Sequence, residues 1–130
     1  MKAIKISATV FLALMGLAFA KVGIEALTNP QAVLANVGIE LNNSSALSSM
    51  RAVYGGMHLV FGLFCFWGAY KMRREALGLV TLYTIGFVVG RLSGVVADGA
   101  PNAFVSQWLV TESISLAIAA FLLFKLRKQE

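Results

Sequence analysis

Four long apolar runs, separated by short polar stretches, make up most of the chain. The runs extend from about Ile4 to Leu27, Ala52 to Tyr70, Ala76 to Ala97 and Ala103 to Phe124. Each is close to the roughly 20 apolar residues that a helix needs to cross a membrane, and none alternates as a strand does. Because backbone groups in lipid must pair within the protein, the pattern predicts an all-α, four-helix transmembrane bundle.

The polar stretches predict how the four helices are connected. Asn29-Pro30 should end the first helix, and residues 31–41 are predicted to include a short helix at the membrane surface. Residues 42–49 are polar and resemble a capped helix start, while residues 71–75 and 98–102 have the composition of tight turns. No repeat, linker or low-complexity segment interrupts the pattern, so residues 1–130 are interpreted as one transmembrane domain.

The composition is that of a membrane protein rather than a soluble one. Hydrophobic residues form 58% of the 130 positions and charged residues only 13%, whereas about a quarter of a soluble domain is charged. A soluble chain of this size cannot bury so much apolar surface, so the excess is predicted to face lipid. The net charge of +5 lies in short clusters between the runs, which argues against nucleic acid as a partner.

The basic residues predict the orientation of the four helices. Eight of the eleven would share one side of the membrane: Lys2, Lys5, Lys71, Arg73, Arg74, Lys125, Arg127 and Lys128. The connections on the other side carry Glu40 and Asp98. Since lysine and arginine are enriched in cytoplasmic loops, both the N and the C terminus are predicted to be cytoplasmic, in a multi-pass protein of the bacterial inner membrane.

The first apolar run has a second interpretation. Two lysines, an apolar stretch and Ala18-Phe19-Ala20 resemble a cleavable signal peptide covering residues 1–20. However, apolar sequence continues from Val22 to Leu27, and cleavage would leave only three helices. Both interpretations remain open.

Polar and ionisable side chains gather in the half of the membrane opposite the basic clusters. Charged groups within a span are costly, so they usually face the protein interior and form pairs. The candidate ligand-binding or buried polar cluster consists of Glu25, Arg51, Tyr54, His58, Arg91, Asp98 and Glu112. No catalytic residue is assigned.

Arg91 and Glu112 are the members of this cluster that we expect to pair. They stand at nearly equal distances before and after the predicted turn at residues 98–102, so an antiparallel hairpin would bring them to the same depth. A bidentate arginine–carboxylate pair is much less costly there than an unpaired charge. Asp98 and Glu25 are competing partners for Arg91 and Arg51. The pair either fixes the register of the helices or forms part of a functional site.

The histidine and the cysteine suggest little chemistry of their own. His58 either relays protons near neutral pH or is a hydrogen-bonded residue of the protein interior. Cys65 is the only cysteine, so an intrachain disulfide is excluded and a small buried side chain is expected. One histidine and one cysteine do not form a convincing metal site; no metal is predicted and no cofactor is identified.

Glycines predict where helices approach each other closely. Gly86, Gly90 and Gly94 recur at four-residue spacing on the third helix, and such a stripe is typical of a helix-packing face. Its partner is either another helix of the chain or a second copy in a homo-oligomer. Gly55 and Gly56 on the second helix are further packing candidates.

Several short motifs together resemble a known family. The segment from Arg51 to Gly56, the pair Gly90-Arg91, the turn Asp98-Gly99 and Glu112 follow one another across three helices. In order and spacing they resemble the bacterial family described as domain of unknown function 4345, over nearly the whole chain. The resemblance implies a small four-helix membrane protein that keeps its first helix, and it implies no activity.

The resemblance also implies which residues the family shares. These are Arg51, Tyr54, Gly55, Gly56, Arg91, Asp98, Gly99 and Glu112, and most of them also belong to the polar cluster or to the candidate packing glycines. His58 is not among them, which weakens the proton-relay hypothesis.

Three functions remain open. The polar cluster favours a binding or carrier protein whose pocket takes a small amphipathic ligand such as a lipid or quinone, with Arg51 and Arg91 holding an anionic or carbonyl group. The alternative is a structural or assembly subunit of a membrane complex. A membrane-embedded enzyme or small transporter component is a further alternative, although no nucleophile–base pair, phosphate loop or metal motif supports catalysis.

Overall fold

The computed structural model describes residues 1–128, which contain helices and no strand. Four helical spans are long and apolar enough to cross a membrane, which confirms the predicted four-helix architecture. They are α1 (Lys2–Thr28), a composite span from Ser44 to Lys71, α5 (Arg73–Asp98) and α6 (Ala103–Arg127). A short helix, α2 (Pro30–Ala35), follows α1.

The second span combines three helical segments: α3 (Ser44–Met50), the π-helical turn η1 (Arg51–Gly56) and α4 (Met57–Lys71). It begins eight residues before the predicted start at Ala52 because Asn43 caps it: the Asn43 side chain accepts a hydrogen bond from the Ala46 amide at 2.8 Å. The polar stretch at residues 42–49 is therefore mostly helical. The π-helical turn η1, which is wider than an α-helical turn, interrupts this span. Such turns inside α-helices often lie at functional sites.

The connections are shorter than predicted. Asn29 ends α1, and its side chain caps α2 by accepting from the Ala32 amide at 3.2 Å, so that α2 covers only the first part of the predicted 31–41 segment. Met72 alone separates α4 from α5, so the third helix begins at Arg73 rather than at Ala76. Gly99, with φ of 94°, ends α5 in a conformation that glycine adopts easily.

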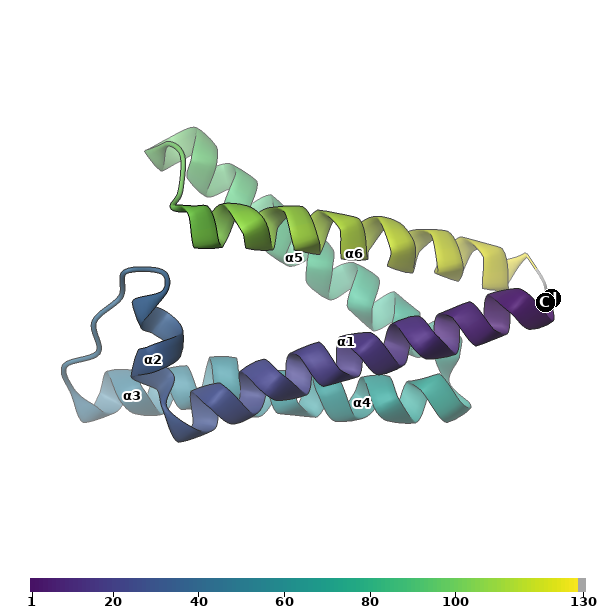
Figure 1. The fold of residues 1–130 in the computed structure, drawn as a ribbon, viewed down its shortest axis with the longest axis horizontal. Helices are drawn as coiled ribbons and strands as arrows, with labels where there is room; N and C mark the ends of the chain where they lie inside the picture. The colour runs from purple at the N-terminus through teal and green to yellow at the C-terminus, as the bar shows by residue number, and fades with distance from the viewer. Residues whose placement is uncertain (129–130) are drawn as a thin grey trace.

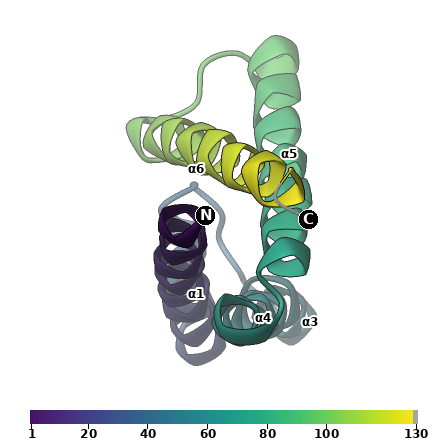
Figure 2. The same cartoon turned by 90° about the vertical axis from the view of Figure 1, so that its right-hand side faces the viewer.

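The four spans form two antiparallel hairpins. One contains α1 packed along η1 and α4, and the other contains α5 packed along α6. The hairpins meet near the start of α1 and the end of α6, and they diverge toward α2 and the α5–α6 turn (Figures 1 and 2). We call these ends of the molecule the terminal end and the loop end.

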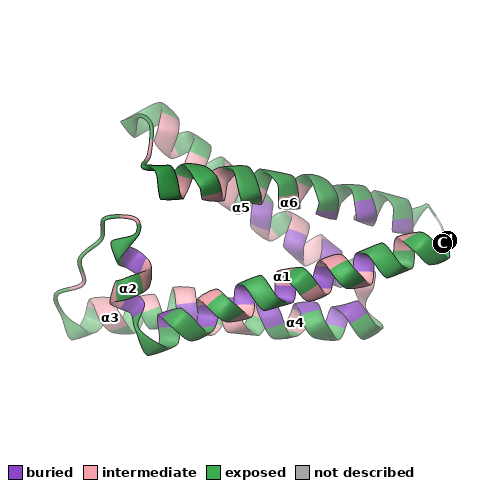
Figure 3. Ribbon diagram, viewed as in Figure 1, coloured by how far each residue is buried: buried purple, intermediate pink, exposed green. Residues whose placement is uncertain are grey.

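The core of buried side chains lies toward the terminal end (Figure 3). All four spans contribute to it: Ala8, Leu12, Phe19, Cys65, Ala69, Ala76, Leu77, Val80, Ala119, Leu122 and Leu126. Between Ile85 and Ile118, by contrast, neither α5 nor α6 has a buried residue. Only 11% of the most apolar part of α5 is buried inside the protein. The exposed apolar surface of this membrane protein is therefore available to lipid.

Glycines join α1 to α4 at close range. A Cβ added to Gly23 would lie 2.7 Å from the Leu59 amide nitrogen, and one added to Gly62 would lie 2.9 Å from both the Ala20 nitrogen and the Gly16 oxygen. Only residues without a side chain permit such an approach of two backbones. Gly55 also packs tightly, against Leu27.

The predicted glycine stripe on the third helix behaves differently. A Cβ added to Gly86, Gly90 or Gly94 would meet nothing within 4 Å. Of the two partners that the sequence leaves open for this stripe, no described helix of the same chain contacts it, because the hairpins diverge here. A second copy stays a prediction. Gly56 is also no packing position, since an added Cβ would meet only the Arg51 carbonyl, at 4.0 Å.

Candidate functional site

Arg91 of α5 and Glu112 of α6 form the ion pair that the sequence predicts. Arg91 Nε donates to Glu112 Oε2 at 2.6 Å, and Arg91 Nη2 donates to Glu112 Oε1 at 3.0 Å. The side chains are 23% and 13% exposed. Arg91 lies seven residues before Asp98, about 10 Å of helix from the loop end, at a depth where an unpaired charge would be costly. The bidentate contact joins the two helices in the region that has no buried side chains.

His58 is buried between the hairpins and fully hydrogen-bonded. Its Nδ1 lies 3.2 Å from the Val53 carbonyl oxygen in η1, and its Nε2 lies 2.7 Å from the Tyr83 hydroxyl. A carbonyl only accepts, so Nδ1 carries the proton, and Nε2 of the neutral ring accepts from Tyr83. These contacts support the interpretation of His58 as a satisfied interior residue and connect η1 to α5.

Aromatic rings surround His58. Tyr54 stacks on it, with the ring centres 5.6 Å apart and the planes 16° apart. Tyr83 packs against Phe87 at 4.8 Å, and Phe19 of α1 packs edge-on to Tyr83 at 5.0 Å. Aromatic pairs in such arrangements stabilise a fold beyond the area that they bury, and here they form one wall of the space between the hairpins.

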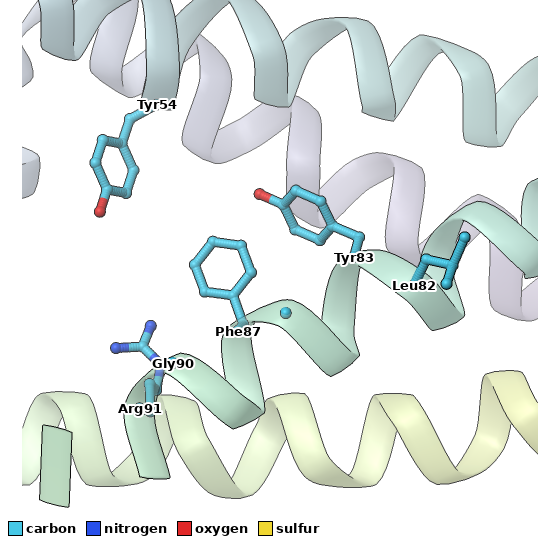
Figure 4. A pocket seen from close by; sticks show the side chains of 7 residues that line it. Tyr54, Leu82, Tyr83, Phe87, Gly90 and Arg91 are labelled. Carbon is cyan, nitrogen blue, oxygen red and sulfur yellow. The ribbon is translucent and has the colours of Figure 1, made fainter. Parts of the chain in front are cut away.

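A cleft of about 460 Å³ opens beside this aromatic cluster. Tyr54 lines it from the α1–α4 hairpin, and α5 supplies the rest of its lining: Leu82, Tyr83, Gly86, Phe87, Gly90 and Arg91. Figure 4 shows the Tyr54 hydroxyl and the Arg91 guanidinium group directed toward the same space from opposite sides, with the Phe87 ring between α5 and Tyr54.

The polar groups of the cleft retain hydrogen-bonding capacity. Glu112 engages Nε and Nη2 of Arg91, whereas Nη1 has no hydrogen bond within residues 1–128. The Tyr54 hydroxyl likewise has none within the described chain. The Tyr83 hydroxyl is already used by His58. The cleft therefore presents two free donors in a largely apolar, aromatic surround, which suits an amphipathic ligand.

Three residues of the predicted cluster lie elsewhere. Arg51 donates through Nη1 to the carbonyl oxygens of Leu27 and, at 3.4 Å, Thr28, because the last carbonyls of a helix lack partners within it. Glu25 pairs with Lys21 one turn away on the exposed face of α1, at 2.7 Å. Arg51 and Glu25 therefore have other partners, and the expected pair between them is not formed.

Asp98 is the third of these residues, which neither line the cleft nor pair with Arg91 or His58. It is exposed at the last position of α5 and forms no ion pair within residues 1–128. Its expected competition with Glu112 for Arg91 is therefore wrong, because the helix places it two turns away at the loop end.

The sequence prediction missed Tyr83 and Phe87. Together with Arg91 they recur every four residues, so they lie on one face of α5, and this spacing was the available signal. The described residues contain no group of three or more histidine, cysteine or acidic side chains arranged to hold a metal ion.

Comparison with known proteins identifies the chain by family alone. No curated protein and no solved structure gives a significant match. The family described as Domain of unknown function (DUF4345) matches residues 7–124, which cover most of all four spans and include the ion pair and the cleft. The chain therefore belongs to the DUF4345 family.

Proposed function

We propose that this protein binds a small amphipathic, lipid-like molecule, with the polar head of the ligand in the cleft between the hairpins. The observation that carries the proposal is the pairing of Arg91 with Glu112 on one edge of the cleft, while Arg91 Nη1 and the Tyr54 hydroxyl face the cleft without a hydrogen bond to any of the described residues. Glu112 orients the guanidinium group, so its remaining N–H groups are preorganised for a ligand.

Tyr54 provides the sharpest test, because its hydroxyl forms no hydrogen bond within residues 1–128. Purified protein would be melted with and without total membrane lipid extract. A ligand at about 100 times its Kd stabilises the folded state by roughly 2.7 kcal/mol, which raises the melting temperature. We expect Tyr54→Phe to lower this ligand-induced rise without changing the melting of the free protein, and Arg91→Ala to abolish it.

Tyr70→Phe is the matched control, since Tyr70 is 71% exposed on α4 and lies outside the cleft. It should leave the ligand-induced rise unchanged. A rise that persists in both Tyr54→Phe and Arg91→Ala would contradict binding in this cleft.

A structural or assembly role is the second candidate. The observation in its favour is the open face at Gly86, Gly90 and Gly94, which would accept a helix of a second copy or of a partner. Because Gly86 and Gly90 also line the cleft, a helix and a ligand would compete for this face. Crosslinking in native membranes tests the candidate, and a strictly monomeric protein without partners would exclude it.

We further propose that the protein lies in the bacterial inner membrane with its terminal end in the cytoplasm. Lysines support this orientation, since Lys2 and Lys5 begin α1, and Lys71 and Lys125 lie in the last turns of α4 and α6. These helix ends lie at the terminal end (Figure 1), and basic residues are enriched on the cytoplasmic side. On a Cys65→Ala background, a membrane-impermeant maleimide added to spheroplasts should label Ser45→Cys and leave Lys125→Cys unlabelled. The reverse labelling would contradict the orientation.

A further inference from the structure

We propose that the head of the ligand is an uncharged planar ring that carries hydrogen-bond acceptors, as in a quinone or another aryl carbonyl with an apolar tail. This inference rests on the proposed function, because it names the ligand class of the same cleft. Three properties of the cleft support it: its charge balance, the kind of hydrogen-bonding groups it leaves free, and its shape.

The charge balance favours a neutral ligand. Glu112 already compensates Arg91 through two hydrogen bonds, so an anionic head would place two negative charges beside one positive charge. Arg51 is directed to the carbonyls at the end of α1, and Lys21 pairs with Glu25. Neither lines the cleft. A net charge about 10 Å inside the span would be poorly solvated, whereas an uncharged head leaves the site neutral.

The free polar groups favour a ligand that accepts hydrogen bonds. Arg91 Nη1 carries only donor hydrogens, and the Tyr54 hydroxyl, which has no hydrogen bond to residues 1–128, can donate. The Tyr83 proton is directed to His58 Nε2. The Glu112 carboxylate, an acceptor, is engaged by Arg91 and does not line the cleft. A carbonyl oxygen between Arg91 and Tyr54 would satisfy both donors.

The shape favours a flat head. Gly86 and Gly90 give α5 a wall without side chains, where an added Cβ would meet nothing within 4 Å. The rings of Tyr54, Tyr83 and Phe87 border this wall (Figure 4). A planar ring fits against glycine backbone and packs on aromatic neighbours by stacking or edge contacts. Leu82, which is 70% exposed, continues the lining and would contact an apolar tail.

The glycines allow a test that separates binding from folding. The protein would be placed in nanodiscs of neutral phosphatidylcholine, and its binding of decylubiquinone would be measured by titration calorimetry. We expect Gly86→Ala and Gly90→Ala to weaken binding at least tenfold, because the new methyl groups occupy the wall of the cleft. Neither should lower the melting temperature, since both methyl groups point into empty space and alanine favours the helix.

Gly94→Ala is the matched control. Gly94 is equally open and belongs to the same stripe, but it does not line the cleft, so its substitution should change binding less than twofold. Equal losses from Gly90→Ala and Gly94→Ala would overturn the inference, because they would indicate a helix along the whole stripe.

A second titration distinguishes failure of the inference from failure of the proposed function. Phosphatidylglycerol, an anionic lipid, would be added in place of decylubiquinone. Binding of phosphatidylglycerol that depends on Tyr54 and Arg91, without binding of decylubiquinone, would overturn the inference and leave the proposed function intact. If neither probe nor the lipid extract bound through these residues, both would fail.

Discussion

The two hairpins of this protein are joined by different means. In the α1–α4 hairpin the backbones touch through glycines, and a Cβ at Gly23 would lie 2.7 Å from the Leu59 nitrogen. In the loop half of the α5–α6 hairpin no residue is buried, and the bidentate Arg91–Glu112 pair links the helices. The α1–α4 hairpin thus depends on close contact of small residues, and the loop half of the α5–α6 hairpin on two long polar side chains.

The comparison explains where the cleft lies. Glycine in α1 and α4 brings two backbones together and leaves no space, whereas Gly86 and Gly90 in α5 face the divergence of the hairpins and form an open wall. The same residue type therefore has opposite consequences within one chain. The partner helix, rather than the glycine itself, decides between a packing face and the wall of a cleft.

The largest effect should come from leaving the Arg91 charge without its partner. Glu112→Leu should destabilise the protein by about 3 kcal/mol, because an unpaired arginine within a span cannot lose its charge. Arg91→Leu should also destabilise the protein, because it leaves the Glu112 carboxylate without its two hydrogen bonds. Unfolding of detergent-solubilised protein by sodium dodecyl sulfate, followed by circular dichroism, measures both.

The double variant measures the interaction energy between Arg91 and Glu112. Arg91→Leu/Glu112→Leu removes both charges, so it should be more stable than Glu112→Leu alone. If the two single losses simply added in the double variant, the pair would make no joint contribution to the hairpin.

A smaller effect should separate the two kinds of glycine. Gly23→Ala should destabilise the protein by about 2 kcal/mol, because the methyl group would push Leu59 and Gly55 of the facing helix away. Gly78→Ala, at an open position of α5 outside the cleft, should be neutral or stabilising by up to about 1 kcal/mol. The same unfolding assay measures both, and equal effects would contradict the contrast between the hairpins.

Part of the structure could be predicted because it depends on local pattern and length. The four spans follow from apolar runs of sufficient length, and the Arg91–Glu112 pair follows from nearly equal distances to the turn at Asp98–Asn102. Helix geometry fixes both, and tertiary packing adds little to them.

The remaining features depend on contacts that the sequence pattern does not specify. Four-residue glycine spacing favours packing in general, yet Gly86 and Gly90 are open because the hairpins diverge, while Gly16 and Gly23 at seven-residue spacing pack closely. The sequence offers Arg51 the carboxylate of Glu25 as a partner. Arg51 instead donates to the backbone carbonyl oxygens at the end of α1, which lie within hydrogen-bonding distance. Each outcome requires the relative placement of two helices.

The smallest predicted effect concerns the loop end, where a hydrogen bond connects the two hairpins. Asn102 Nδ2 donates to the Asn36 carbonyl at 3.0 Å, while its Oδ1 caps α6 by accepting from the Val105 amide at 2.9 Å. Asn102→Asp keeps the cap, since aspartate is an equally good N-cap, and removes only the donor. The free energy of unfolding should fall by about 0.5–1 kcal/mol, visible as faster amide hydrogen exchange in residues 34–41 with little change in the melting temperature.

Asn102→Ala, which loses both contacts, should also accelerate exchange in the first turn of α6. If Asn102→Asp left exchange in residues 34–41 unchanged, the hairpins would be held at this end without the Asn36 contact, and their divergence would be set by the terminal core alone.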